Sequence, residues 1–331
     1  MLLISLLISL SSCFGGKEVF FVSGQTMGTT YSIKIASKQV DTLSLKLKVE
    51  DTLREVNRQM STYIPTSEIS RVNSATKDEL IEISPWFKKV LTYSLDLAEK
   101  TGGFYDPTLG PLINLWGFGP KGRREVPEKE KIKEALAVVG YKRLSVVKEQ
   151  DKILVKKELD GVYVDLSSSA KGFGVDMLSE LLVKEGYLNH LVEIGGELRS
   201  SGTKFNSGWK VAVEKPSSGE KNLQMVVPLK DISIATSGDY RNFFNAGNKK
   251  YSHTLDVKTG EPVQHKLVSV SVLDKECMKA DALATALMSL GPEKAKKYAL
   301  DNNLAVYLVF EGADAKLQTF ESPSFNRLKS N

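Results

Sequence analysis

The sequence predicts an α+β fold, with mixed, mainly antiparallel sheets and helices packed against them. Short apolar segments typical of strands often follow one another with only a glycine-bearing turn between them. Amphipathic helical segments are interspersed among them without the regular alternation that βαβ units would give. No internal repeat or low-complexity linker divides the chain, so the sequence shows no clear domain boundary.

Length and charge narrow the classes of function. The 331 residues and a hydrophobic content of 41% allow a sizeable core. The 45 basic and 40 acidic residues give a net charge of +5, and the two signs are interspersed. This pattern argues against nucleic acid as a partner, whereas an anionic small molecule fits.

The N-terminus resembles an export signal. Residues 1–12 form an uncharged apolar run that is too short to span a bilayer. The tetrad Leu10-Ser11-Ser12-Cys13 resembles the lipobox of bacterial lipoproteins, although the usual positive residues before the apolar run are absent. We expect residues 1–12 to be a signal peptide and residues 13–331 one domain. If Cys13 carries lipid, Cys277 has no disulfide partner, and we expect it to be a small buried residue.

The first half of the chain predicts a hairpin, three helices and two short strands. The helices are indicated by apolar residues at helical spacing, by Ser84-Pro85 as a cap and first residue, and by the pair Gly102-Gly103 as a stop. The glycine- and aromatic-rich segment 102–120 lacks a period and is interpreted as a long ordered loop. The expected strands are 19–21, 31–35, 144–147 and 153–155, and the expected helices are 43–60, 85–101 and 127–138.

The second half predicts more strands and three helices. Segment 162–164 reads as a strand, followed by a serine-rich turn at 167–169 and a helix to about residue 185. Pro292 begins the last expected helix, after the helix that ends at Gly291. The further expected strands are 191–194, 209–213, 225–229, 232–235, 268–273 and 305–310.

Segment 280–291, ADALATALMSLG, places two oxygen-bearing side chains on one helix face. Asp281 and Thr285 are four residues apart, so they lie one turn above the other. A carboxylate and a hydroxyl so placed suit a hard cation such as magnesium. The alternative is that neither residue binds a ligand: the helix dipole favours an aspartate such as Asp281 in the first turn, and Thr285 faces the core.

Two further segments carry polar residues of interest. Backbone amides at the start of the helix after Ser167–Ser169, together with Lys171, suit a phosphate, although a serine cap explains the same residues. His253 lies in a polar stretch beside a strand, where either proton transfer or a structural role fits a histidine. No GxGxxG, Walker lysine, paired-histidine zinc, CxxC or GxSxG motif occurs.

Seven motifs together resemble the ApbE family, the FAD:protein FMN transferases. They occur in that family's order over nearly all of residues 13–331: MGTTY, GGFYDPTLGPLINLWGFG, AKGFGVD, IGGEL, TSGDYRNF, SHTLD and ADALATALMSLG. The resemblance implies a T-fold-related α+β architecture. It also implies magnesium-dependent transfer of FMN from FAD to a threonine hydroxyl of an acceptor flavoprotein of the electron-transport type, with release of AMP.

The resemblance also implies roles for individual residues. Asp281, Thr285 and the carbonyl of Ser168 would bind magnesium, and Tyr63 would stack on the flavin. Ser167–Ser169 stand where the family has small or apolar residues. His253 would accept the proton of the attacking hydroxyl. The FAD site would be lined by Met27, Tyr63, Phe104, Tyr105, Asp106, Asp165, Lys171 and the backbone at Leu255.

The same motifs leave two other functions open. With water as the nucleophile, the protein would be an FAD pyrophosphatase that yields FMN and AMP. Without catalysis it would be a flavin-binding lipoprotein. Members of this family are typically exported and often lipid-anchored, so we expect the protein in the bacterial cell envelope, at the periplasmic face of the inner membrane, held by a lipid on Cys13.

Overall fold

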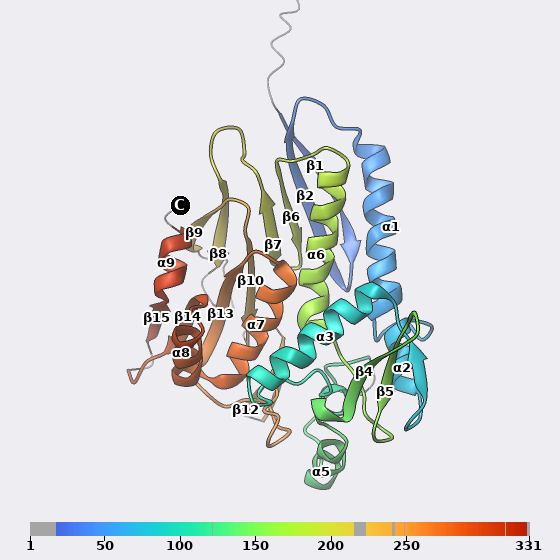
Figure 1. Cartoon of the computed structure of the whole chain (residues 1–331). Coiled ribbons are helices and arrows are strands. Elements are labelled where there is room, and N and C mark those ends of the chain that lie inside the picture. The colour runs from blue at the N-terminus through green and yellow to red at the C-terminus, as the bar shows by residue number, and fades with distance from the viewer. Residues whose placement is uncertain are drawn as a thin grey trace, which may run out of the picture.

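The structure is a computed structural model that describes residues 18–120, 122–214, 223–239, 242–247, 249–314 and 316–329. An eight-stranded antiparallel sheet organises the described residues, in the order β1-β2-β6-β7-β10-β13-β14-β15 (Figure 1). The predicted α+β class with mainly antiparallel pairing is therefore confirmed. The strands of this sheet are β1 (Glu18–Thr26), β2 (Thr29–Ser37), β6 (His190–Ile194), β7 (Glu197–Ser201), β10 (Ser233–Gly238), β13 (Leu267–Asp274), β14 (Ala305–Glu311) and β15 (Leu317–Glu321).

Helices cover one face of the sheet, and α6 and α7 lie side by side on it (Figure 1). They are α6 (Ser167–Lys184) and α7 (Cys277–Leu290), with α1 (Thr42–Met60) beside α6. The other helices are α2 (Glu68–Ser74), α3 (Pro85–Lys100), α4 (Gly110–Leu115), α5 (Lys129–Ala137), the 3-10 turn η1 (Tyr141–Arg143), α8 (Pro292–Asp301) and α9 (Pro323–Lys329).

The opposite face of the sheet is also covered, and this explains the continuous apolar runs of its central strands. In β14, Val306 and Leu308 pack toward α7, whereas Tyr307 and Val309 pack toward a hairpin on the other face and toward α9. That hairpin is β8 (Trp209–Glu214) with β9 (Leu223–Leu229). The smaller sheets are β3 (Leu80–Glu82), β5 (Lys152–Lys157) and β4 (Leu144–Glu149), and the hairpin β11 (Phe243–Ala246) with β12 (Lys249–Ser252).

Three details differ from the sequence prediction. Residues 162–164 are extended but do not form a named strand, because the backbone of Val164 exchanges both hydrogen bonds with the Asn73 side chain, at 2.7 and 2.9 Å. The serines at 167–169 form the first turn of α6, and the Asp165 carboxylate accepts the Ser167 amide. The expected loop 102–120 contains α4, which has a proline in its first turn.

The N-terminal prediction lies outside the described residues, because both residues 1–12 and Cys13 precede Glu18. Among the described residues, no helix combines the length and the apolar character that crossing a bilayer requires. Cys277 is buried and unpaired, as expected.

Candidate active site

The candidate site lies where α6 and α7 pack against each other. The amide of Gly172, in α6, donates to Asp281 Oδ2, in α7, at 3.0 Å. A Cβ on Gly172 would lie 2.4 Å from the Cys277 carbonyl oxygen, so only glycine allows this approach. Asp281 is 3% exposed. The carboxylate is therefore fixed by a backbone contact that depends on a glycine.

The bond between Gly172 and Asp281 brings the carboxylate close to the first turn of α6. In a regular helix the amide of Gly172 faces the carbonyl four residues earlier, which is that of Ser168. Because this amide donates to Asp281 Oδ2, the carboxylate lies beside the Ser168 carbonyl. A backbone carbonyl in this position is a suitable cation ligand.

The oxygen atoms expected to hold magnesium come from these same two helices. Thr285 lies one turn after Asp281 in α7, and its hydroxyl is 3.2 Å from that of Ser237. In the described part of the chain, no three His, Cys, Asp or Glu side chains cluster as metal ligands. A cation here would thus use one carboxylate, one hydroxyl and one carbonyl, a set of oxygens that fits magnesium better than a soft metal.

Lys171 lies between two buried carboxylates. Its Nζ is 3.6 Å from Glu197 Oε1 and 3.8 Å from Asp281 Oδ2. Burial opposes the charge of the ammonium, but Asp281 and then Glu197 outweigh this effect and raise the pKa of Lys171. Burial raises the pKa of Glu197 to about 8, against the opposing effect of Lys171.

A second carboxylate fixes the start of α7. Asp176, in α6, accepts the amides of Cys277 and Met278, each at 2.9 Å, and pairs with Arg199 Nη1 at 2.5 Å. A carboxylate at a helix N-terminus satisfies amides that have no partner within the helix. The two helices are therefore joined in both directions, by Asp281 onto α6 and by Asp176 onto α7.

The segment 104–106 joins the same centre. The Tyr105 hydroxyl is 2.8 Å from the Ser168 hydroxyl, and the Phe104 carbonyl accepts from Ser289, in α7, at 2.8 Å. Asp106 accepts the amide and the hydroxyl of Thr108, so its carboxylate holds the local loop. Burial raises the pKa of Asp106, against these hydrogen bonds.

Tyr63 is exposed, as a ring that stacks on a ligand has to be. Its side chain is 67% exposed and lies after the end of α1. Burial of its phenol end and the nearby Asp165 raise the pKa of Tyr63, whereas Arg124 lowers it. Asp165 and Arg124 therefore both lie within electrostatic range of this ring.

Met27 occupies the two-residue turn between β1 and β2. Both Met27 and Gly28 have positive φ, of 50° and 71°, which is the pattern of a tight hairpin turn but is uncommon for methionine. The turn lines a cavity of about 480 Å³ formed by residues 25–30. Gly174, in α6, makes room for this side chain, because a Cβ there would be 3.1 Å from Met27 Cε.

His253 follows directly after β12 and is held by the backbone. Its Nδ1 lies 3.1 Å from the Asn242 carbonyl. Since a carbonyl only accepts, Nδ1 carries the proton, and in the neutral ring Nε2 keeps a free lone pair. Burial, with a smaller contribution from Lys171, lowers the pKa of His253 against the effect of this hydrogen bond.

Leu255, whose backbone is expected to line the FAD site, is held in place by its side chain and by a backbone bridge. Its side chain is buried with Leu112, Trp116 and Ile132. Its backbone forms an isolated bridge to Pro262. The side chain anchors the segment, as expected for a residue whose main chain faces a ligand.

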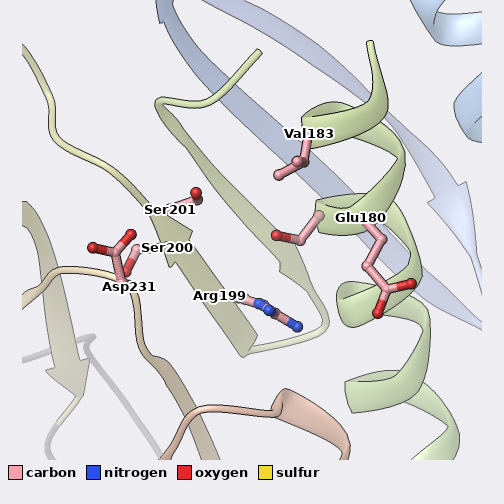
Figure 2. A pocket seen from close by; sticks show the side chains of 7 residues that line it. Glu180, Val183, Arg199, Ser200, Ser201 and Asp231 are labelled. Carbon is pink, nitrogen blue, oxygen red and sulfur yellow. The ribbon is translucent and has the colours of Figure 1, made fainter. Parts of the chain in front are cut away.

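A further cavity of about 330 Å³ is lined mainly by residues of α6 and β7 (Figure 2). It opens beside α6 and β7 and contains none of the residues predicted from the sequence. Its lining is formed by Ser179, Glu180, Val183, Arg199, Ser200, Ser201 and Asp231.

The structure connects part of the predicted set through contacts around α6 and α7, and it adds three residues that sequence reasoning did not assign. Lys171, Asp281, Ser168, Tyr105 and Phe104 are connected around α6 and α7, as described above. Glu197, Asp176 and Gly172 were missed as individual residues. Each belongs to a motif quoted from the sequence, IGGEL or AKGFGVD, so membership of a motif was the available signal.

Comparisons with known proteins agree with this architecture. The family model "ApbE family" matches residues 27–308. A protein from Haemophilus influenzae called FAD:protein FMN transferase is 42% identical, over 98% of this chain and 96% of its own. The structure of the flavin transferase ApbE from Vibrio cholerae, at 40% identity, aligns with a TM-score of 0.86 over 94% of this chain and 99% of that chain.

A second structure of the Vibrio cholerae enzyme, in which glycine replaces a histidine, aligns with a TM-score of 0.85. The family model spans most of the chain, and the relatives are matched over nearly their whole length. This protein therefore belongs to the ApbE family.

Proposed function

We propose that the protein transfers FMN from FAD to a threonine hydroxyl of an acceptor flavoprotein, with magnesium as the required cation. The relatives named as FAD:protein FMN transferases support transfer of FMN to a protein. The observation that carries the cation site is the Gly172 amide bound to Asp281, since it holds the buried carboxylate beside the first turn of α6, which contains the Ser168 carbonyl.

The reaction exchanges a phosphoanhydride bond for a phosphoester bond. The threonine oxygen forms a bond to the phosphorus of the FMN half, and the bond from that phosphorus to the bridging oxygen breaks. AMP leaves with that oxygen and its electron pair, and the hydroxyl proton passes to a base. No oxidant or reductant is needed.

The residues at the crossing of α6 and α7 suit the charge that develops. Asp281, Thr285 and the Ser168 carbonyl would hold magnesium, which when bound neutralises negative charge on the pyrophosphate oxygens. Lys171 adds a fixed positive charge beside them, and its raised pKa keeps it charged at neutral pH. Phe104 and Tyr105 fix the adjoining loop against these two helices, and Asp106 holds the turn of that loop by accepting from Thr108.

His253 is the base that this geometry supports. Its Nδ1 proton is directed at the Asn242 carbonyl, so Nε2 of the neutral ring is the atom able to accept the hydroxyl proton. The lowered pKa keeps the ring neutral at neutral pH. His190 and His265 fit less well, because each has both ring nitrogens hydrogen-bonded within the protein.

The remaining parts of FAD would be bound by Tyr63, Met27, Asp165 and the backbone at Leu255. The exposed ring of Tyr63 can stack on the isoalloxazine without first breaking a packing contact. Met27 is presented by a strained turn, a kind of conformation that is often retained where a ligand binds.

We also propose that the chain is exported and anchored by a lipid on Cys13, at the periplasmic face of the inner membrane. The apolar run of residues 1–12 and the tetrad that ends in Cys13 support this. Incorporation of a labelled fatty acid tests the proposal. We expect label on the wild-type chain and none on Cys13→Ser, and label on both would refute anchoring at this residue.

The mass of a co-expressed acceptor tests the transfer. We expect the acceptor to gain the mass of FMN only with FAD and magnesium, and a threonine-to-valine acceptor to gain none. Release of FMN and AMP without added mass would instead show a pyrophosphatase. Unchanged FAD under all conditions would show a protein that only binds flavin.

A further inference from the structure

Glu197 is buried beside the proposed cation site but is not one of its ligands. It is the first residue of β7 and follows Gly195 and Gly196, whose positive φ values of 62° and 107° turn the chain into the site. Its side chain is 6% exposed. Among the described residues, its Oε2 has no hydrogen-bond partner, although this atom is buried. An unpaired buried oxygen costs folding free energy, so its presence indicates a role other than stabilising the fold.

Lys171 is the only cation within salt-bridge distance of Glu197 in the described part of the chain. The pair is 3.6 Å apart, while Asp281 Oδ2 lies 3.8 Å from the same ammonium. One ammonium thus serves two buried carboxylates, and three ionised groups would leave a surplus negative charge. A buried surplus of one sign is unfavourable until a cation compensates it.

The two carboxylates have different tasks in the proposed reaction. Asp281 would bind the divalent cation, and a lysine bound tightly to this carboxylate competes with that cation. With Glu197 present, the Lys171 ammonium has a second carboxylate at a similar distance. Without Glu197, Asp281 is the remaining carboxylate within 4 Å of Lys171 in the described structure.

We infer that Glu197 is a positioning residue, which holds the Lys171 ammonium away from full pairing with Asp281 and so keeps Asp281 available to the divalent cation. This rests on the cation site of the proposed function. Glu197 acts through Lys171, and its ionised form also adds negative charge near the site. Both effects strengthen cation binding.

A purely structural ion pair makes the opposite prediction for stability. If Glu197 served only to join β7 to α6, Glu197→Gln would break a buried pair and lower the melting temperature. As a positioning residue, Glu197 is a buried carboxyl with one unpaired oxygen and a raised pKa in the cation-free protein, so Glu197→Gln leaves the melting temperature unchanged or raises it. In the second case cation affinity falls without a loss of stability.

The test uses the full chain and magnesium alone. Titration calorimetry gives the Kd of Mg²⁺, and thermal unfolding in EDTA gives the stability of the cation-free protein. We expect Glu197→Gln to raise the Kd at least about tenfold without lowering the melting temperature. Glu193→Gln is the matched control, since Glu193 lies on the neighbouring strand β6 and pairs with Ser32. We expect it to leave the Kd unchanged.

A double-mutant cycle with Lys171→Met decides the case in which both affinity and stability fall. If Glu197 acts through Lys171, the loss of affinity caused by Glu197→Gln is smaller when Lys171 is already absent. An equal loss in both backgrounds overturns the inference, as does an unchanged Kd in the single variant. Wild-type protein that binds no Mg²⁺ would refute the cation site itself, so the two failures are distinguishable.

Discussion

The two sides of the candidate site differ in how firmly they are built. On one side, α6 and α7 are fixed by buried carboxylates that bind backbone amides, and Gly172 leaves no space between them. On the other side, His253 borders the two-stranded hairpin of β11 and β12, which is not part of the main sheet. A hairpin of two strands contributes little stability of its own.

The contacts on the His253 side are of a different kind. Trp116, Phe244 and Tyr251 stack on one another, and Arg124 bonds to Asn242 and lies over Phe118. Trp116 is buried, whereas Phe244, Tyr251 and Arg124 are partly or fully exposed. We therefore interpret the crossing as the rigid half and the hairpin as the adaptable half. Under the proposed function the crossing would hold the pyrophosphate and the hairpin would meet the acceptor protein.

The largest expected effect comes from removing the carboxylate of the rigid half. Asp281→Ala loses the only charged ligand of the proposed cation and leaves Lys171 paired with Glu197 alone. We expect transfer to fall by about a thousandfold or more, measured as FMN mass added to the acceptor per minute. Asp301→Ala, an exposed aspartate on α8, should keep the wild-type rate. Normal transfer by purified Asp281→Ala would rule out this ligand.

Replacement of His253 should slow transfer without weakening cation binding. Loss of a general base costs about 10²–10⁴-fold, so His253→Ala should lower kcat and leave the Kd of Mg²⁺ unchanged. Because the pKa of His253 is lowered, the active, neutral ring persists below the usual histidine range. The rate should therefore fall with decreasing pH only below about 6.5. An acid limb unchanged in His253→Ala would assign it to another group.

Gly172 and Gly174 provide a matched pair within α6. Gly172→Ala places a Cβ 2.4 Å from a backbone oxygen, so the two helices have to separate, at about 1–3 kcal/mol, and the Kd of Mg²⁺ should rise with the loss of stability. Gly174→Ala meets only the ends of Ile194 and Met27 at 3.1 Å, and the gain in helix propensity offsets part of that cost. Equal melting temperatures for the two variants would show that the crossing is not tight.

The smallest effect on the fold should come from Tyr63. Its ring is mostly exposed, so Tyr63→Ala should change the free energy of unfolding by less than about 0.5 kcal/mol. The loss of stacking should weaken FAD binding by about 1–3 kcal/mol, measured as the Kd of FAD, whereas Tyr63→Phe should retain most of the affinity. Equal Kd values for all three proteins would place the flavin elsewhere.

Long periodic segments were predictable from the sequence. Short elements, and a segment whose backbone hydrogen bonds go to a side chain, were not. The helices α1, α3 and α7 follow from their apolar spacing and caps, and the strands β13 and β14 from their apolar runs. The short elements α2, α4, β3, β7, β15 and α9 went unnoticed, since three to seven residues carry little periodicity. Segment 162–164 has strand composition, but the Asn73 side chain takes the hydrogen bonds that a neighbouring strand would have made.

The candidate site was only partly predictable from residue patterns. The spacing of Asp281 and Thr285 on one helix face could be derived, but their relation to α6 is tertiary, and family resemblance supplied it. Glu197 and Asp176 show the limit of such reasoning. Glu197 follows two glycines, a pattern that indicates only a turn. Asp176 lies in an apolar helix, and the sequence does not show that its partners are the amides of Cys277 and Met278.

The bond between Gly172 and Asp281 spans 109 positions of the chain, and this has a consequence for biogenesis. The entropic cost of closing so long a loop has to be met before the contact can stabilise the fold. A growing polypeptide that has not yet reached Leu290 lacks the complete helix α7 and therefore one wall of the candidate site. The proposed cation site therefore forms only after both helices have been synthesised and packed together.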